Sequence, residues 1–199
     1  MGRMMNEHGL RFALAGLLLS STAGIVGADT PGEPAKLRLS AFAVNLAGIG
    51  RLRAEQIQIV IERWSTDAEH DRLLDVLKDK GSDKLLDALQ ALKPRAGYIR
   101  TTTSLGWDIQ YAREHPLPEG GRRIVFATDR PMSFVELRDQ TRSSEYEFVL
   151  CEIRLGKDDT GEGKLATLAK ISWDKAKNHI EIENYGLEPV RLTRVEIEK

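Results

Sequence analysis

The sequence predicts an α+β fold, a mainly antiparallel β-sheet or partly closed barrel with an inserted two-helix hairpin. Segments with a period of two, in which apolar and polar residues alternate, lie on both sides of residues 66–94. Within that stretch, leucines instead recur at helical spacing in two short runs. Short polar turns separate the last four alternating segments, which favours antiparallel pairing of successive strands.

Nine segments are expected to be strands, two before the helices and seven after them. Gly48-Ile49-Gly50 interrupts the chain between the first two and is read as a turn, because no strand-turn-helix pattern supports a phosphate site. In the last segment the apolar phase shifts between Leu192 and Val195, which predicts a bulge near Thr193-Arg194. The expected strands cover residues 37–46, 55–64, 98–102, 107–112, 123–128, 146–155, 165–173, 179–185 and 190–197.

The helical hairpin has clear end signals. Thr66 with Glu69 three residues later is typical of a capping box, and Gly81 ends the first helix. Ser82 is expected to cap the second helix, which Pro94 ends. The apolar stripes are narrow, so both helices are expected to pack on the sheet through the leucines Leu73, Leu77, Leu85 and Leu89.

Residues 1–28 have the three-part pattern of a secretory signal peptide. Arg3 and Arg11 precede an apolar run, and small residues lead to a cleavage site after Ala28. The run is shorter than the roughly 18 residues that cross a bilayer, and no cysteine follows for lipid attachment. We therefore expect an exported protein, periplasmic or secreted, with no transmembrane segment after the signal is removed.

The mature chain of 171 residues has 27 basic and 29 acidic groups, a net charge of −2. Residues 29–36 are expected to be a flexible segment, and 37–199 a single β-rich domain. The whole chain is 41% hydrophobic and has a net charge of −1, which argues against disorder and against a nucleic-acid partner. Its one cysteine, Cys151, lies in an apolar strand and is read as a buried thiol.

No catalytic or metal-binding motif stands out. His70 is expected on a charged helix face, His115 in a loop before Pro116, and His179 on the polar side of a strand, without the spacing of metal ligands. Ser104 is read as part of a turn and not as a nucleophile. The acidic loop 157–163 lacks the ligand spacing of a calcium site. We therefore predict no cofactor and no metal.

The residues between Pro94 and Gly156 are rich in arginine. This stretch has nine arginines, nine acids and no lysine. One interpretation is a network of fixed ion pairs; the other is a pocket for an anionic or aromatic ligand, with Trp107, Arg122 and Arg130 as candidates. The arginines are Arg95, Arg100, Arg113, Arg122, Arg123, Arg130, Arg138, Arg142 and Arg154, and their expected partners are Asp108, Asp129, Glu136, Asp139, Glu145, Glu147 and Glu152.

Several short blocks resemble a family of uncharacterised exported bacterial proteins. They are 62–66 (Glu-Arg-Trp-Ser-Thr), 106–108 (Gly-Trp-Asp), 127–131 (Ala-Thr-Asp-Arg-Pro), 161–165 (Gly-Glu-Gly-Lys-Leu) and 182–185 (Ile-Glu-Asn-Tyr). The resemblance implies a bacterial exported origin and a single intact domain. It implies no activity.

These observations favour a non-enzymatic exported domain that binds a small ligand or a protein partner. Two alternatives remain: a hydrolase whose acid-base pair comes from scattered residues, and a structural protein of the cell envelope. A deep cleft with a desolvated carboxylate beside a histidine would favour the hydrolase, whereas an open apolar cavity would favour a small ligand.

Overall fold

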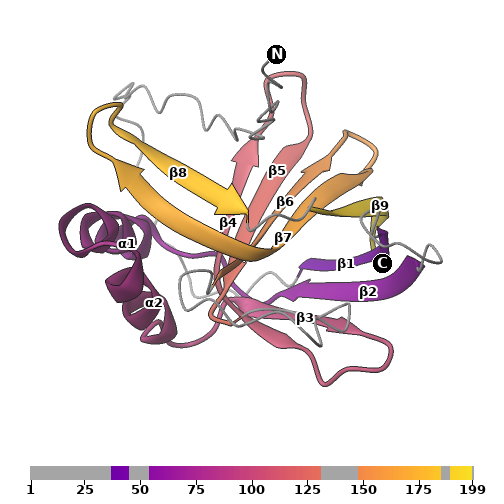
Figure 1. Ribbon diagram of the computed structural model, residues 1–199. Helices are drawn as coiled ribbons and strands as arrows, with labels where there is room; N and C mark the ends of the chain where they lie inside the picture. The colour runs from indigo at the N-terminus through magenta and orange to yellow at the C-terminus, as the bar shows by residue number, and fades with distance from the viewer. Residues whose placement is uncertain (1–36, 45–53, 131–147, 185–188, 199) are drawn as a thin grey trace, which may run out of the picture.

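A computed structural model describes residues 37–44, 54–130, 148–184 and 189–198 of the chain, and its strands close into an antiparallel barrel (Figure 1). Eight strands form the ring in the order β1-β2-β3-β4-β5-β6-β7-β9, and β9 pairs again with β1. The elements are β1 (Leu37–Val44), β2 (Ala54–Ile61), α1 (Asp67–Lys80), α2 (Ser82–Gln90), β3 (Gly97–Thr101), β4 (Trp107–Pro116), β5 (Arg122–Thr128), β6 (Phe148–Leu155), β7 (Thr160–Asp174), β8 (His179–Asn184) and β9 (Val190–Ile197).

Strand β7 closes the barrel because it is 15 residues long and has different partners along its length. Its first part pairs with β6 on one edge and with β9 on the other, while its last part, from Ala169 to Asp174, pairs with β8. The expected pairing of 179–185 with 190–197 is therefore wrong for the described residues. β8 extends beyond the ring, whereas β9 returns to the first part of β7.

The predicted bulge in the last strand is confirmed. On β1, Ser40 and Phe42 are two residues apart, but their partners Glu196 and Thr193 are three apart. The same extra residue is seen from β7, and Arg194 has a positive φ of 50°. The bulge restores the inward phase, so that Leu192 and Val195 both face the core.

The interior of the barrel is filled by side chains from all eight strands. Most are branched aliphatic residues that alternate along each strand, as a closed barrel of this size requires. Phe126 contributes the largest of them. The described part of the barrel is thus a packed core. Its fully buried side chains include Leu39, Ile57, Ile59, Ile61, Ile99, Ile109, Ile124, Phe126, Ile153 and Leu155.

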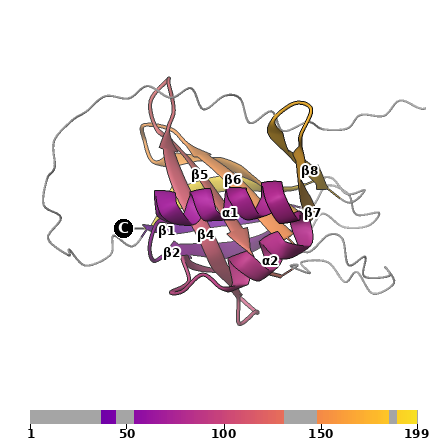
Figure 2. The ribbon, with the colours of Figure 1, turned by 90° about the vertical axis from the view of Figure 1, so that its left-hand side faces the viewer.

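The helical hairpin covers part of the outer surface of the barrel (Figure 2). Leu73, Leu77, Leu85 and Leu89 are all buried, as expected. They share a second apolar cluster with strand residues whose side chains point away from the barrel interior. The end of β7 and β8 extend this cluster over α1, where the Lys78 ammonium lies 4.8 Å from the Trp173 ring centre. The strand residues buried in this cluster are Ala127, Phe148, Ala166, Ala169 and Ile171.

The end signals of the first helix are confirmed, and that of the second is not. The Thr66 hydroxyl accepts from the Glu69 N–H at 3.2 Å, and the Glu69 carboxylate accepts from the Thr66 N–H at 2.9 Å. The N-cap of α2 is Gly81 and not Ser82, because one glycine with φ of 84° both ends α1 and begins α2. The Arg63 side chain joins the two ends of the hairpin, since it binds both Glu69 carboxylate oxygens and the Pro94 carbonyl.

Two boundaries differ from expectation in a way that affects function. β4 continues to Pro116, so His115 lies in a strand and not in a loop. β7 begins at Thr160, so the acidic loop shrinks to a short turn in which Thr160 donates to Asp158. In both places the residues lack the alternation of apolar and polar side chains from which a strand is predicted.

Several expectations fall outside the described residues. They are the signal peptide with its cleavage site at Ala28, the segment 29–36, the turn 48–50, and Arg138 and Arg142. Among the residues that are described, no helix is both long and apolar enough to span a bilayer.

Truncating the helix leucines tests the packing of the hairpin. Leu77→Ala and Leu89→Ala should each lower the free energy of unfolding by about 2 to 5 kcal/mol, because each leaves a cavity in the outer apolar cluster. Leu105→Ala is the matched control: Leu105 is fully exposed, so its loss should change stability by less than about 0.5 kcal/mol. Urea unfolding followed by circular dichroism measures all three. Helix variants as neutral as the control would contradict the packing.

Candidate functional site

A second β-bulge determines which side chains of β4 point to the outside of the barrel. Ile109 pairs with Thr128 and Tyr111 with the very next residue, Ala127, so Gln110 is extra. Beyond the bulge Ala112 takes the inward position. Tyr111, Arg113 and His115 therefore all point to the outside of the barrel, on one face of the strand.

The first turn of α1 is held against this face by Ser65. The Ser65 N–H donates to the Ala112 carbonyl at 2.7 Å, and the Ser65 hydroxyl accepts from the Ala112 N–H at 3.1 Å. This places α1 beside the outward side chains of β4. The Arg113 guanidinium donates to the Asp67 carboxylate at 2.6 Å, and His70 Nδ1 lies 2.8 Å from the Tyr111 hydroxyl.

Burial fixes the protonation of the His70–Tyr111 pair. Desolvation raises the pKa of Tyr111 to about 12, so its hydroxyl keeps its proton at neutral pH. Desolvation, followed by the nearby Arg113 charge, lowers the pKa of His70. The contact is thus a hydrogen bond between two neutral groups, in which the tautomer of His70 determines which group donates. The nearby Asp67 carboxylate is engaged by Arg113 and has an exposed side chain, so the three groups do not form a desolvated acid-base pair.

Next to this pair lies a group of residues that we call the basic cluster: Arg113, His115, Arg123 and Arg154. His115 on β4 stands directly opposite Arg123 on β5, which stands directly opposite Arg154 on β6. Burial, followed by the charges of Arg123 and Arg113, lowers the pKa of His115. The neighbouring guanidinium charges thus disfavour a proton on His115.

The arginines of the basic cluster differ in whether they have an ion pair. Arg113 is paired with Asp67, and the Arg154 Nε donates to Glu152 at 2.8 Å. Arg123 has no ion pair with a described carboxylate. Its Nε–H is shielded from water and meets no acceptor among the described residues.

The three candidates named from the sequence do not form one pocket. Trp107, at the start of β4, packs half-buried against the barrel core. Arg130 lies at the same end of the barrel and donates to the carbonyl of Gly106 at 3.0 Å. Arg122 lies at the opposite end of β5, where its fork binds Glu114 and Asp159.

Of the remaining described arginines, Arg95 supports the ion-pair interpretation and Arg100 does not. Arg95 donates to Glu62 and, as expected, to Asp108, while its guanidinium also lies over the Tyr98 ring. Arg100 donates to the Gln58 amide oxygen at 2.9 Å. Arg100, Arg123 and Arg130 thus have no ion pair with a described carboxylate, and no pattern in the sequence distinguishes them from the paired arginines.

One group of side chains could in principle ligate a metal. The ligand atoms of Asp174, His179 and Glu181 all lie within 4.8 Å of one another, because the β7–β8 hairpin places Asp174 opposite His179. The Lys177 ammonium, however, binds both carboxylates, at 2.9 Å and 3.3 Å. One Asp174 oxygen also accepts two backbone N–H groups of the turn. These contacts describe a stabilised hairpin turn, in which a cation would have to displace Lys177.

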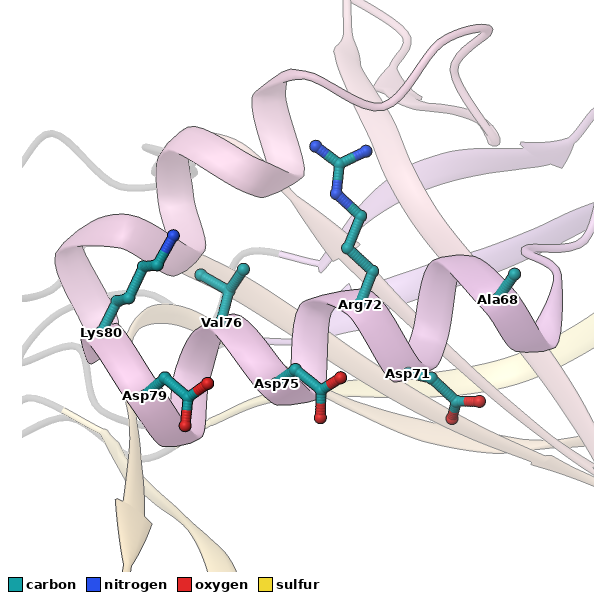
Figure 3. A pocket seen from close by; sticks show the side chains of 7 residues that line it. All are labelled: Ala68, Asp71, Arg72, Asp75, Val76, Asp79 and Lys80. Atoms are coloured by element: carbon teal, nitrogen blue, oxygen red, sulfur yellow. The ribbon is translucent and has the colours of Figure 1, made fainter.

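The described surface has open hollows, of which two bear on the candidate residues and the helical hairpin. One, of about 370 Å³, lies over β2 and β3 and includes Ser104, whose hydroxyl accepts from the Thr101 N–H as a turn residue does. The other, of about 440 Å³, is a furrow on α1 itself (Figure 3). Asp71, Asp75 and Asp79 form one wall of this furrow. Such a row of acids on a solvent-facing helix is common in proteins without a ligand.

The structure confirms that Cys151 is a buried thiol, as expected from the sequence. Its side chain is buried in the barrel core, and burial raises the pKa of the thiol well above its usual value. A protonated, inaccessible thiol is a poor nucleophile.

The His70–Tyr111 pair predicts how stability depends on pH. Since folding lowers the pKa of His70 and His115, the unfolded state binds more protons below its own histidine pKa, near 6.5. Stability should therefore be fully present above pH 6.5 and fall between pH 6.5 and 5. Arg113, Asp67 and Asp71 are the charges that face His70. In His70→Gln this fall should be smaller, as measured by urea unfolding at both pH values; an unchanged fall would contradict the assignment.

Arginine-to-lysine substitutions distinguish an arginine that binds two carboxylates from one that has a single exposed ion pair. Arg122 binds two different carboxylates with two nitrogens, which a lysine ammonium cannot reproduce in the same geometry. Arg122→Lys should therefore lower the free energy of unfolding by about 1 kcal/mol. Arg154→Lys, at an exposed single pair, should change it by less than about 0.5 kcal/mol. Equal changes in the free energy of unfolding, measured by thermal unfolding, would show that the two-carboxylate contact of Arg122 adds no stability beyond that of a single ion pair.

Comparison with known proteins gives no relative for this chain. No family model matches it, and neither the curated proteins nor the solved structures searched contain a match.

Proposed function

We propose that this protein is an exported binding domain whose ligand or protein partner contacts the outer surface of the barrel. The observation that carries the proposal is the filled interior: inward side chains from every strand occupy the space in which a larger barrel would hold a ligand. Recognition is then left to the outer face, the loops at the ends of the barrel and the helical hairpin. Export rests on the signal-like residues 1–28 and on the resemblance described above.

The outer surface has features suited to recognition. In the basic cluster, the half-buried side chain of Arg123 has no ion pair with a described carboxylate. The β3–β4 turn presents the fully exposed Leu105, and β1 presents Phe42. Isolated exposed apolar residues are common on monomers, so charge gives the better support for a binding surface here.

The geometry gives less support to a hydrolase. Two histidines lie near carboxylates, but those carboxylates already have basic partners. Asp67, near His70, binds Arg113. Asp174 and Glu181, near His179, both bind Lys177. No carboxylate is among the buried polar groups of the described residues.

Native mass spectrometry of the protein purified from its own source tests both parts of the proposal. The mature chain should begin at Asp29, and a partner or anionic ligand should be retained on its surface and dissociate at high salt. An apolar molecule retained at high salt would contradict surface binding, since it would require an internal cavity. A chain that keeps Met1 would contradict export.

A further inference from the structure

A polar hollow lies on the outer face of the barrel away from the helical hairpin. The hairpin packs on outward residues of β5, β6 and β7, and Figure 1 shows it on one side of the barrel with β1 and β2 on the other. The hollow over β2 and β3 has a volume of about 370 Å³, which is within the range of small-ligand sites. Its lining comes from β2, from β3 with the turn after it, and from Glu198 after the end of β9.

Gln58 holds an arginine and a glutamate in place in this hollow. Its amide oxygen accepts from the Arg100 Nε at 2.9 Å, and its amide nitrogen donates to the Glu198 Oε2 at 2.7 Å. Arg100 stands directly opposite Gln58 in the sheet, and its guanidinium also lies 5.5 Å from the Tyr98 ring centre. Because both ends of the Gln58 amide are engaged, a positive and a negative side chain are fixed on either side of one neutral group.

The hollow keeps hydrogen-bonding groups that the described residues do not use. The terminal nitrogens of Arg100 and the second carboxylate oxygen of Glu198 have no hydrogen bond to a described residue. The Gln56 amide also has none within the described part of the chain. Arg100 and Gln56 are exposed and Glu198 is half-buried, so a ligand in the hollow can reach all three side chains.

An exposed aromatic ring stands next to these polar groups. Phe42 on β1 is directly opposite Gln56, so the two side chains leave the same face of the sheet with their Cβ atoms about 5 Å apart. Phe42 is 37% exposed, and it is one of the two large apolar side chains that are exposed among the described residues. Its ring therefore offers apolar surface at the border of the hollow, which an apolar part of a ligand can cover.

The charges in the hollow disfavour an ion of either sign. An anion attracted by Arg100 would also meet Glu198, and a cation attracted by Glu198 would also meet Arg100. A ligand without net charge avoids both repulsions and can still use Arg100 as a donor and Glu198 as an acceptor. Hydrogen bonds to charged groups are stronger than those between neutral groups, so a ligand that carries several hydroxyl groups gains from both.

We propose that this hollow binds a neutral carbohydrate. Sugar hydroxyl groups accept from Arg100 and donate to Glu198, with the Gln56 amide beside them, and the C–H face of a sugar ring packs on Phe42. A hydroxyl group both donates and accepts, which matches a hollow that presents both kinds of group. This assignment goes beyond the proposed function, because it names a site away from the basic cluster and a ligand without net charge.

Isothermal titration calorimetry of the purified protein tests the class of ligand. The probes are cellohexaose, maltohexaose and chitohexaose, three neutral oligosaccharides, each titrated at low and at high sodium chloride concentration. At least one should bind saturably, with the same Kd at both salt concentrations, because no net charge is neutralised on binding. Absence of saturable binding to all three would overturn the proposal, and so would a Kd that rises steeply with salt.

Variants locate the binding in the hollow. Arg100→Gln and Phe42→Ala should each weaken binding by about tenfold, since one removes a charged donor and the other the aromatic surface. Phe42→Trp keeps an aromatic ring and should bind as the parent protein does. Arg154→Gln is the matched control, because Arg154 is also exposed and donates through its Nε to a neighbouring side chain, but lies on β6.

Circular dichroism of each variant shows whether the fold is kept, and the exposed positions of Phe42 and Arg100 lead us to expect that it is. Saturable binding that Arg100→Gln and Phe42→Ala leave unchanged would overturn the site. A protein partner retained by the purified protein, together with no oligosaccharide binding, would overturn this site and leave the proposed function standing.

Discussion

The structure depends on the length of β7. Because β7 has 15 residues, its first part can form backbone hydrogen bonds with β9 and its last part with β8. The pairing with β9 is the one that completes the ring. Closure removes the exposed edges of an open sheet and forces inward side chains into one shared space. In this chain that space is filled by aliphatic residues and Phe126. The filled interior leaves the outer face, the barrel ends and the helical hairpin as the accessible parts of the described structure.

Closure also determines where the outer side chains go. Because the bulge at Gln110 reverses the phase of β4, the outward face of this strand changes along its length. At Tyr111 the outward face meets the helical hairpin, whose leucines cover the neighbouring Ala127 and Phe148. Further along, at His115, the same face belongs to the basic cluster. One β-bulge therefore places Tyr111 and His115 on the same outer face of β4. The hydrogen bond of Ser65 to Ala112 holds α1 beside them.

Much of the fold could be predicted from local patterns. The alternating segments, the capping box at Thr66 and the phase shift before Val195 each carry their own signal, and the structure bears them out. What could not be predicted depends on contacts distant in sequence. Nothing near residues 179–197 shows that β9 leaves β8 to join β1, and nothing near His115 shows that it faces Arg123. The candidates Trp107, Arg122 and Arg130 were chosen by composition, which cannot distinguish an arginine with two acids from one with none.

Two neighbouring arginines on β5 have opposite electrostatic surroundings. Arg122 and Arg123 are adjacent in sequence, yet their side chains leave opposite faces of β5. Arg122 at the end of the barrel meets Glu114 and Asp159, so its charge stabilises the fold. Arg123 meets a histidine and an arginine, and a neutral residue in its place would remove a shielded donor at no described cost. The face of the strand on which an arginine lies therefore decides whether an acid is within its reach, and adjacent positions in the sequence do not reveal this difference.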